Sequence, residues 1–323
     1  MVIDGHNDLV LHRWRGEESR HLDLDAAAAA GFAGGFFALY VPSAASFKEP
    51  EAGPYALPMP DSVSHEDAAR IAEELYAALC ELPVSQALSA DDFREGAITA
   101  IVHMEGAEPI APDLSNLRAW YERGLRSIGP VWSRANAFAE GVPFRFPDSP
   151  DTGPGLTEAG RALVRACNEL GILVDLSHLN EQGFWDVADI STAPLVATHS
   201  NAHALCPSTR NLTDRQLDAI RDSGGIVGVN FAVSFLREDG GLRPDETGID
   251  EIVRHVVYLA DHMGVDHVGY GSDFDGATIP AELGGVAGLP RLGEALTAAG
   301  LDDDALAKIT HGNWLRVLRA TWH

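Results

Sequence analysis

Short apolar segments alternate with longer segments of helical periodicity along nearly the whole chain of 323 residues. Near-continuous apolar character is typical of parallel strands that helices cover on both faces. Eight such strands in alternation predict an α/β fold, a single-domain (β/α)8 TIM-type barrel over residues 1–323, with an open doubly wound sheet as the alternative. The predicted strands are Val2–Asp4, Phe36–Val41, Ala97–His103, Arg126–Val131, Ile172–Leu176, Leu195–Thr198, Gly225–Phe231 and His267–Tyr270.

Helices are expected between these strands. In the longest of them Ile71, Leu75 and Leu79 fall on one apolar stripe. Thr157 is a suitable N-cap for another. The predicted helices are Asp25–Ala30, Glu66–Leu82, Leu156–Leu170, Asp214–Asp222, Ile249–Met263 and Asp304–Thr321. Two stretches rich in glycine and proline, Phe47–Ser62 and Ala139–Gly155, predict long loops.

Composition narrows the class of protein. A net charge of −25 and a pI near 4.7 argue against a nucleic-acid partner, which would favour a basic face. Three widely spaced cysteines, Cys80, Cys167 and Cys206, do not form a disulfide framework and fit a reducing compartment. Because neither a signal peptide nor a membrane-spanning stretch is evident, we expect a cytoplasmic protein with no membrane partner.

Polar residues with ligand chemistry follow the ends of the apolar segments, which is where barrel enzymes carry their active sites. They are His6, Asp8, Glu105, His178, His199 and Asp273. A lone histidine at a strand end is more often structural, as is expected for His103, His203 and His311. His6 and Asp8 are two residues apart, however, so in an extended chain both can point to the same side and bind one ion.

Five ligands suit two ions better than one, because a catalytic zinc usually takes three protein ligands and a water. Glu105 is the expected bridge, since its strand would lie between those carrying the other ligands. Asp273 then remains as a proton shuttle or, alternatively, as a turn residue, and Asp275 is expected to serve turn chemistry. Arg210 is either a clamp for a substrate carboxylate or a partner in a surface salt bridge.

The segments "DGHNDL", "HMEGAE", "VDLSH", "THSNAHALCPSTRNLTD", "GSDFDG" and "ITHGNWLRVL" together resemble the renal (membrane) dipeptidase family, zinc metallopeptidases on a barrel of the amidohydrolase type. The resemblance implies two Zn²⁺ per chain, one bound by His6 and Asp8 and one by His178 and His199, with Glu105 and a water bridging them. It also implies Asp273 as the catalytic acid and base, and Arg210 as a substrate contact.

Members of this family cleave dipeptides, including those with a C-terminal D-residue, and some open β-lactams. Dimers are common among them, so a homodimer is compatible with the resemblance.

One position departs from the family pattern. Trp132 stands where the fourth strand often ends in a histidine that contacts the tetrahedral intermediate. An indole offers one neutral N–H donor, so Trp132 donates weakly to the substrate oxygen, or zinc acts alone there, or Arg134 contributes.

Rival functions remain at this stage. The chain has no G-x-S-x-G element, which argues against a serine hydrolase. Another hydrolase with two metals, such as an amidase, lactonase or deaminase, would carry a similar ligand set. A non-catalytic barrel is disfavoured, because all five ligand positions and Asp273 are present.

Overall fold

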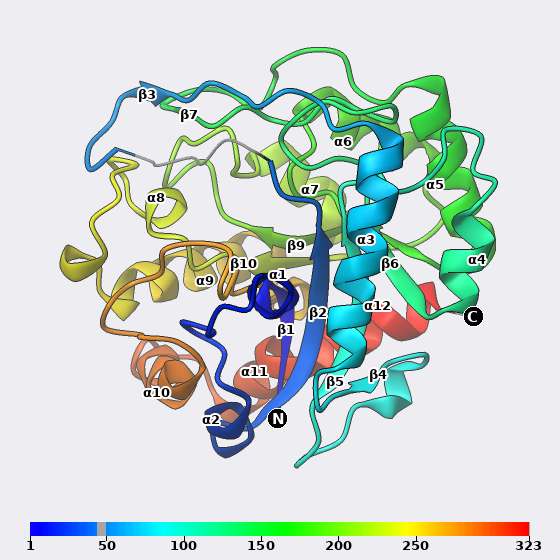
Figure 1. The fold of residues 1–323 in the computed structure, drawn as a ribbon. Helices are drawn as coiled ribbons and strands as arrows, with labels where there is room; N and C mark the ends of the chain where they lie inside the picture. Colours follow the sequence, from blue (N-terminus) through cyan, green and yellow to red (C-terminus); the bar gives the residue numbers. More distant parts are fainter. Residues whose placement is uncertain (44–49, 323) are drawn as a thin grey trace.

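The computed structural model describes residues 1–43 and 50–322 (Figure 1), so the first three residues of the predicted loop Phe47–Ser62 lie outside the described residues. In the described chain, parallel strands pair in the order β8–β6–β5–β2–β1–β11–β10–β9. Their bounds are β1 (Val2–Asn7), β2 (Phe32–Tyr40), β5 (Thr99–Glu105), β6 (Leu125–Gly129), β8 (Leu173–Val174), β9 (Val196–Ser200), β10 (Ile226–Val229) and β11 (Val268–Tyr270). The short β4 (Ser85–Gln86) pairs with β5 outside this path.

The two outer strands of this order, β8 and β9, meet and close the sheet into a barrel. Asp175 forms a parallel bridge with Val196, and the Leu176 amide donates to the Val196 carbonyl at 2.8 Å. Beyond this point the Asp175 carboxylate, and no longer a backbone carbonyl, accepts from the Thr198 amide at 2.8 Å, which explains why β8 ends early. The predicted (β/α)8 barrel is confirmed, and the open-sheet alternative is wrong.

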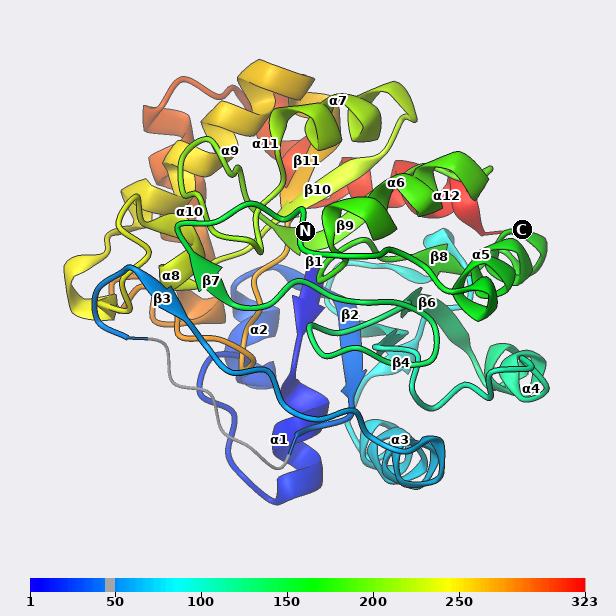
Figure 2. The same cartoon turned by 90° about the horizontal axis from the view of Figure 1, so that it is seen from above.

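Helices surround the strands, as Figure 2 shows from above. Their bounds are α1 (Leu9–Arg15), α2 (Leu24–Ala29), α3 (His65–Cys80), α4 (Leu117–Glu122), α5 (Glu158–Leu170), α6 (Glu181–Ile190), α7 (Asp214–Asp222), α8 (Val233–Leu236), α9 (Ile249–Met263), α10 (Leu289–Ala298), α11 (Asp303–Ala307) and α12 (Asn313–Thr321). Thr157 caps α5 as predicted, since its hydroxyl accepts from the Gly160 amide at 3.1 Å. Within residues 1–43 and 50–322, no helix combines the length and apolar character needed to cross a membrane.

The C-terminal helix α12 closes the end of the barrel at which the strands begin. Trp314 is fully buried in a cluster with strand residues that include Ile3 and Phe36. Its indole donates to the Tyr270 carbonyl at 3.1 Å. Gly5 of β1 has no room for a side chain, because a Cβ there would collide with the Thr198 carbonyl and the Trp314 ring. Because the end of the barrel at which the strands begin is filled, a cavity can open only at the carboxyl ends of the strands.

The two predicted loops pair with each other above that open end. Strand β3 (Tyr55–Ala56) lies antiparallel to β7 (Arg145–Phe146), and the pair lies at the top of Figure 1. The pairing continues where the Leu57 amide donates to the Phe144 carbonyl at 2.9 Å. The prediction of long loops therefore missed a small second sheet, whose strands are about ninety residues apart in the chain and only two residues long.

Candidate metal centre and cavity

The predicted ligands come together at the carboxyl ends of the barrel strands. Glu105, the last residue of β5, lies between the others: its Oε2 is 3.6 Å from His6 Nε2, and its Oε1 is 3.1 Å from His178 Nε2 and 3.6 Å from His199 Nε2. Asp8 Oδ2 is 3.2 Å from His6 Nε2. All five side chains are buried. The two oxygens of Glu105 thus face different histidines, which is the arrangement a bridging carboxylate requires.

Asp273 lies beside the first pair of ligands. Its amide donates to the His6 carbonyl at 3.1 Å, and the Asp8 amide donates to the Phe274 carbonyl at 2.8 Å, so the backbone after β11 runs alongside the end of β1. Ligand atoms of His6, Asp8 and Asp273 lie within 4.8 Å of one another, as do those of His6, Glu105 and His199. Asp273 therefore stands within reach of a cation held by His6 and Asp8.

Hydroxyl groups orient the imidazoles of the second histidine pair. Thr198 Oγ1 lies 2.6 Å from Asp175 Oδ2 and 2.8 Å from His199 Nδ1. Since the threonine donates its single proton to the carboxylate, it accepts from His199 Nδ1, and the lone pair of His199 is on Nε2. Ser133 Oγ lies 2.8 Å from His178 Nδ1. Such partners on the far nitrogen are typical of histidines that bind metal ions.

The charges of the centre call for a cation. Burial, reinforced by the neighbouring carboxylates of Asp8 and Asp273, raises the pKa of Glu105 to about 8. Burial also raises the pKa of Asp273. Burial alone would lower the pKa of His6. The carboxylates of Glu105 and Asp8 outweigh this effect and raise the pKa of His6 to about 10. For His178, burial and the positive Arg210 keep the pKa well below its usual value. The neutral imidazole of His178 can offer a lone pair, and the crowded carboxylates beside a positively charged His6 favour a cation at this place.

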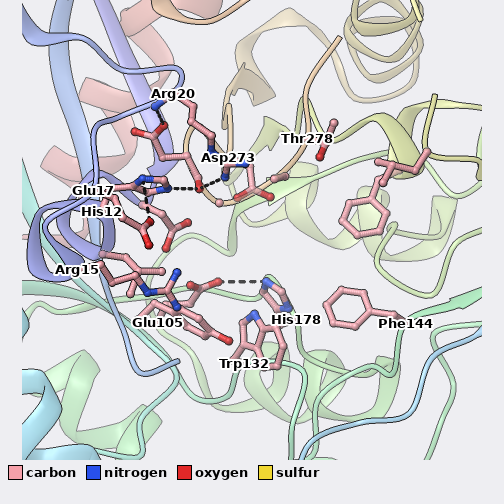
Figure 3. A pocket seen from close by; sticks show the side chains of 18 of the residues that line it. His12, Arg15, Glu17, Arg20, Glu105, Trp132, Phe144, His178, Asp273 and Thr278 are labelled. Carbon is pink, nitrogen blue, oxygen red and sulfur yellow. Dashed lines mark hydrogen bonds and ion pairs between the residues drawn. The ribbon is translucent and has the colours of Figure 1, made fainter. Parts of the chain in front are cut away.

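A cavity of about 740 Å³ opens above these groups, with Asp8, Glu105, His178 and Asp273 among its lining residues. One side is apolar and largely aromatic, formed by Tyr40, Leu57, Trp132, Phe144, Phe235 and Leu242. The opposite side is charged, formed by Arg15, Glu17, Glu18 and Arg20 from the end of α1 and the loop after it. Figure 3 shows Arg15, Glu17 and Arg20 facing Phe144 across the space that Glu105 and His178 border.

Trp132 belongs to the aromatic side. It is 8% exposed, and its ring centroid lies 5.7 Å from that of His178 and 5.6 Å from that of Phe144. Arg134, the other candidate for contact with the substrate oxygen, is engaged elsewhere. Its Nε pairs with Glu108 Oε1 at 3.0 Å, one Nη donates to the Val41 carbonyl at 2.7 Å, and the residue is not among those that line the cavity.

Arg210 lies behind the aromatic side. Its guanidinium donates to the His199 carbonyl at 3.1 Å and lies over the Phe235 ring, 5.5 Å from the centroid. Arg210 is 3% exposed, so the alternative of a surface salt bridge is wrong. The structure thus brings the arginine, from the loop after β9, beside the candidate ligand His199 and the cavity residue Phe235, although Arg210 is not itself among the residues that line the cavity.

Sequence reasoning missed the supporting residues Asp175, Thr198, Ser133 and Asn230. Asp175 is three residues before His178 in "VDLSH", and Thr198 directly precedes His199 in "ATHS", which was the available signal. Asp275 does more than shape a turn. Its carboxylate accepts from the amides of Arg20 and His21 and thereby fastens the charged side of the cavity to the loop after β11.

His103 is a structural histidine, as expected. It is fully buried beneath the centre, with Nδ1 2.9 Å from Ser127 Oγ and Nε2 3.6 Å from Asp175 Oδ2. Burial lowers its pKa to about 3, so the ring is neutral. His203 Nε2 meets the Asp148 carbonyl at 2.9 Å, and His311 Nδ1 lies 3.1 Å from Thr310 Oγ1. Neither histidine is among the residues that line the cavity.

Comparison with known proteins agrees with this geometry. The crystal structure of a metallo peptidase from Rhodobacter sphaeroides, liganded with a phosphinate mimic of the dipeptide L-Ala-D-Ala, superposes with a TM-score of 0.96 at 50% identity over 99% of both chains. An uncharacterised protein in the pqqA 5' region of Klebsiella pneumoniae is 56% identical over 73% of this chain and 88% of its own length.

A dipeptidase of Claviceps purpurea, tcpJ, is 29% identical over 98% of this chain and 76% of its own length. The family model of membrane dipeptidases, peptidase family M19, matches residues 1–322. The chain belongs to the membrane dipeptidase family, peptidase family M19.

Proposed function

We propose that this protein hydrolyses dipeptides, including those whose C-terminal residue is a D-amino acid, with two zinc ions bound in the candidate centre. The observation that carries the proposal is the place of Glu105, whose carboxylate faces His6 on one side and His178 and His199 on the other. Cleavage of dipeptides with a C-terminal D-residue is supported by the Rhodobacter sphaeroides relative, which was crystallised with a mimic of L-Ala-D-Ala.

In this proposal His6 and Asp8 would hold one ion, His178 and His199 would hold the other, and Glu105, which lies between the two pairs, would serve both. Bound zinc would supply Lewis-acid polarisation of the scissile carbonyl and a lower pKa for the attacking water. The chain supplies the orientation. Ser133 and Thr198 fix the imidazole rings of His178 and His199 from behind, so their Nε2 atoms stay directed at the centre.

Asp273 acts as the acid and base. The attacking water gives one proton to its carboxylate, which later delivers that proton to the nitrogen of the leaving amine. The carboxylate lines the cavity beside Asp8, and the backbone of Asp273 is fixed by its hydrogen bond to His6. From this position the Asp273 carboxylate would serve both the attacking water and the leaving nitrogen.

Arg210 binds the C-terminal carboxylate of the dipeptide, and Trp132 contacts the substrate on the aromatic side. A cavity of about 740 Å³ is within the usual range of small-molecule sites and suits two residues better than a long chain. Arg210 is held near His199 and behind Phe235, a lining residue of the cavity, so in this proposal the guanidinium reaches the carboxylate from that side. A fixed carboxylate anchor places the last peptide bond of the substrate at the centre, and the size of the cavity limits what precedes that bond.

The test combines metal analysis with a substrate panel. Protein purified without chelators should hold two zinc ions per chain, lose activity on exhaustive chelation and regain it when zinc is restored. L-Xaa-D-Xaa and L-Xaa-L-Xaa dipeptides should be cleaved, whereas N-acetylated dipeptides and tripeptides should be poor substrates. Folded, zinc-loaded protein that cleaves tripeptides as readily as dipeptides would contradict the proposal. The cytoplasmic location and a homodimer stay predictions from the sequence.

A further inference from the structure

We infer that Asn230, directly after β10, is a positioning residue that aims the carboxylate of Asp273 for proton transfer. The inference rests on the proposed function, in which Asp273 carries the proton. Asn230 Nδ2 donates to Asp273 Oδ2 at 2.9 Å, and Asn230 is fully buried. Nothing in the composition of the strand end "GVNFA" marks this asparagine, whose partner is 43 residues away.

The orientation of the Asn230 amide is fixed by a second hydrogen bond. Its Oδ1 accepts from the Ala232 amide at 2.6 Å. An amide whose oxygen is bound to an N–H donor must present its NH₂ group in the other direction. The group facing Asp273 Oδ2 is therefore a donor.

The backbone of Asn230 is also fixed, through a reciprocal pair with Asn201. The Asn230 amide donates to Asn201 Oδ1 at 3.1 Å, and Asn201 Nδ2 donates to the Asn230 carbonyl at 2.9 Å. Asn201 is two residues beyond His199, a predicted ligand, and is itself fully buried. A chain of side-chain and backbone contacts thus links the loop after β9, the end of β10 and the carboxylate after β11.

The backbone of Asp273 is fixed, so only its side chain still needs to be positioned. Its φ of 59° is a left-handed conformation that few residues other than glycine adopt. The amide of Asp273 bonds to His6, and its carbonyl accepts from Gly276 at 3.2 Å and from Ala277 at 3.1 Å. With the backbone held on both sides, the free motion is rotation of the carboxyl group. The bond from Asn230 stops that rotation.

The geometry assigns different tasks to the two carboxylate oxygens. Oδ2 accepts from Asn230, while Oδ1 lies with Asp8 Oδ2 against Gly276, a residue that lines the cavity. In the hydrolysis, water oxygen forms the new bond to the carbonyl carbon and the C–N bond breaks. One water proton moves to Oδ1 and then to the amine nitrogen, so a carboxylic acid and an amine leave with all atoms accounted for. Without Asn230 either oxygen takes the proton, and fewer encounters are productive.

The test uses a pair of substrates that differ in the need for that proton. L-Ala-D-Ala loses an amine, which requires protonation. Its thiodepsipeptide analogue, with sulfur in place of the peptide N–H, loses a thiolate, and a thiol is acidic enough to leave without a proton. The variants are Asn230→Asp, which keeps the acceptor for Ala232 but removes the donor, and Asn230→Ala, which removes both.

We expect both variants to retain two zinc ions and to lower kcat for the peptide by roughly ten- to a hundredfold, with KM little changed. Turnover of the thiodepsipeptide should fall by a clearly smaller factor, because its thiolate leaves without the proton that Asp273 delivers, and only uptake of the water proton still depends on the aimed carboxylate. The matched control is Asn313→Asp, since Asn313 is a buried asparagine that donates to the Val265 and Val268 carbonyls at the opposite end of the barrel. It should leave the ratio of the two activities unchanged.

Equal losses on both substrates would overturn the inference, because delivery of the proton to the leaving amine would then not depend on Asn230. Unchanged turnover of the peptide in both Asn230 variants would overturn it as well. Wild-type protein that is folded and zinc-loaded yet cleaves neither substrate would overturn the proposed function, and the inference with it. Circular dichroism and zinc content of each variant are measured beside the kinetics, so a fold defect is recognised as such.

Discussion

The Thr198 hydroxyl, 2.8 Å from Nδ1 of His199, determines which nitrogen of that imidazole can bind a metal ion. The hydroxyl is committed as a donor to Asp175 at 2.6 Å. His199 therefore carries its proton on Nδ1, and its Nε2 lies 3.0 Å from Nε2 of His178. Two neutral imidazoles that direct nitrogens at one another are stabilised when a cation lies between them and their carboxylate neighbours.

The first prediction concerns this hydroxyl. Thr198→Val keeps the shape of the side chain but removes the link from Asp175 to His199, so the ring loses its fixed orientation. We expect zinc affinity to fall by about ten- to a hundredfold, the usual effect of losing a partner behind a metal-binding histidine. Competition with a chelator of known affinity measures it. Thr321→Val, which removes a buried hydroxyl bonded to the Val317 carbonyl on α12, serves as the control. Equal zinc affinity in Thr198→Val and wild type would contradict the assignment.

The second prediction concerns proton transfer. Asp273→Asn preserves size and hydrogen bonding but cannot carry the proton, so kcat should fall by roughly 10²- to 10⁴-fold while KM changes little. Zinc content should stay near two ions per chain, because His6, Asp8 and Glu105 remain. Near-full turnover of this variant would show that another group moves the proton. Loss of one zinc would instead make Asp273 a ligand, which its position beside His6 and Asp8 also allows.

The third prediction concerns the substrate carboxylate. Arg210→Met keeps an apolar stem beside Phe235 but removes the guanidinium, so KM should rise most for dipeptides with a free C-terminal carboxylate. Dipeptides ending in a carboxamide should be affected far less, since they offer no charge to clamp. Steady-state kinetics on matched pairs gives the comparison. An equal rise in KM for both members of a pair would argue that Arg210 acts through His199, to whose carbonyl it donates.

The barrel and the convergence of the candidate ligands could be predicted because their signals are local. Most strands belong to short, largely apolar segments, and parallel strands end on the same side, so the convergence of residues such as Glu105 and His199 could be predicted without knowledge of any tertiary contact. Thr157 was identified as a cap by the same kind of local rule. Helix α6 was missed although its cap, Asn180, was visible and accepts from the Gly183 amide at 2.8 Å. A glycine within the first turn obscured the helical pattern.

The remainder depends on contacts between distant parts of the chain. The pairing of β3 with β7 is made by two-residue strands, which leave no periodic pattern. The role of Asp275 became evident only when its carboxylate met the amides of Arg20 and His21, more than 250 residues away. The sequence could not decide whether Trp132 or Arg134 contacts the substrate. Only the structure shows that Arg134 is paired with Glu108.

The last prediction concerns pH and stability, at a histidine outside the metal centre. His255 on α9 is fully buried, accepts from the Ala202 amide at 3.3 Å through Nδ1, and meets the Leu236 carbonyl at 2.9 Å through Nε2. Burial, with a smaller contribution from Arg254, lowers its pKa to about 4. The unfolded chain takes up this proton near pH 6.5, whereas the folded chain does so only near pH 4.

His255 therefore adds stability that is fully present above pH 6.5 and is lost as the pH falls toward 4. In His255→Gln this loss is absent, so the free energy of unfolding of wild type minus that of the variant should decrease by roughly 3 kcal/mol between pH 7 and pH 4. Urea unfolding at each pH measures the difference, in which the titration of all other groups cancels.

Leu259→Ala is the matched control, because it leaves a cavity on the same helix without altering a titratable group. Its destabilisation should stay constant over the same pH range, on the order of 2–5 kcal/mol. A His255→Gln difference that is equally constant would mean that the folded protein accommodates a charged His255, which its bond from the Ala202 amide forbids. A difference that grows as the pH falls would reverse the sign of the linkage and exclude burial as the dominant influence on this residue.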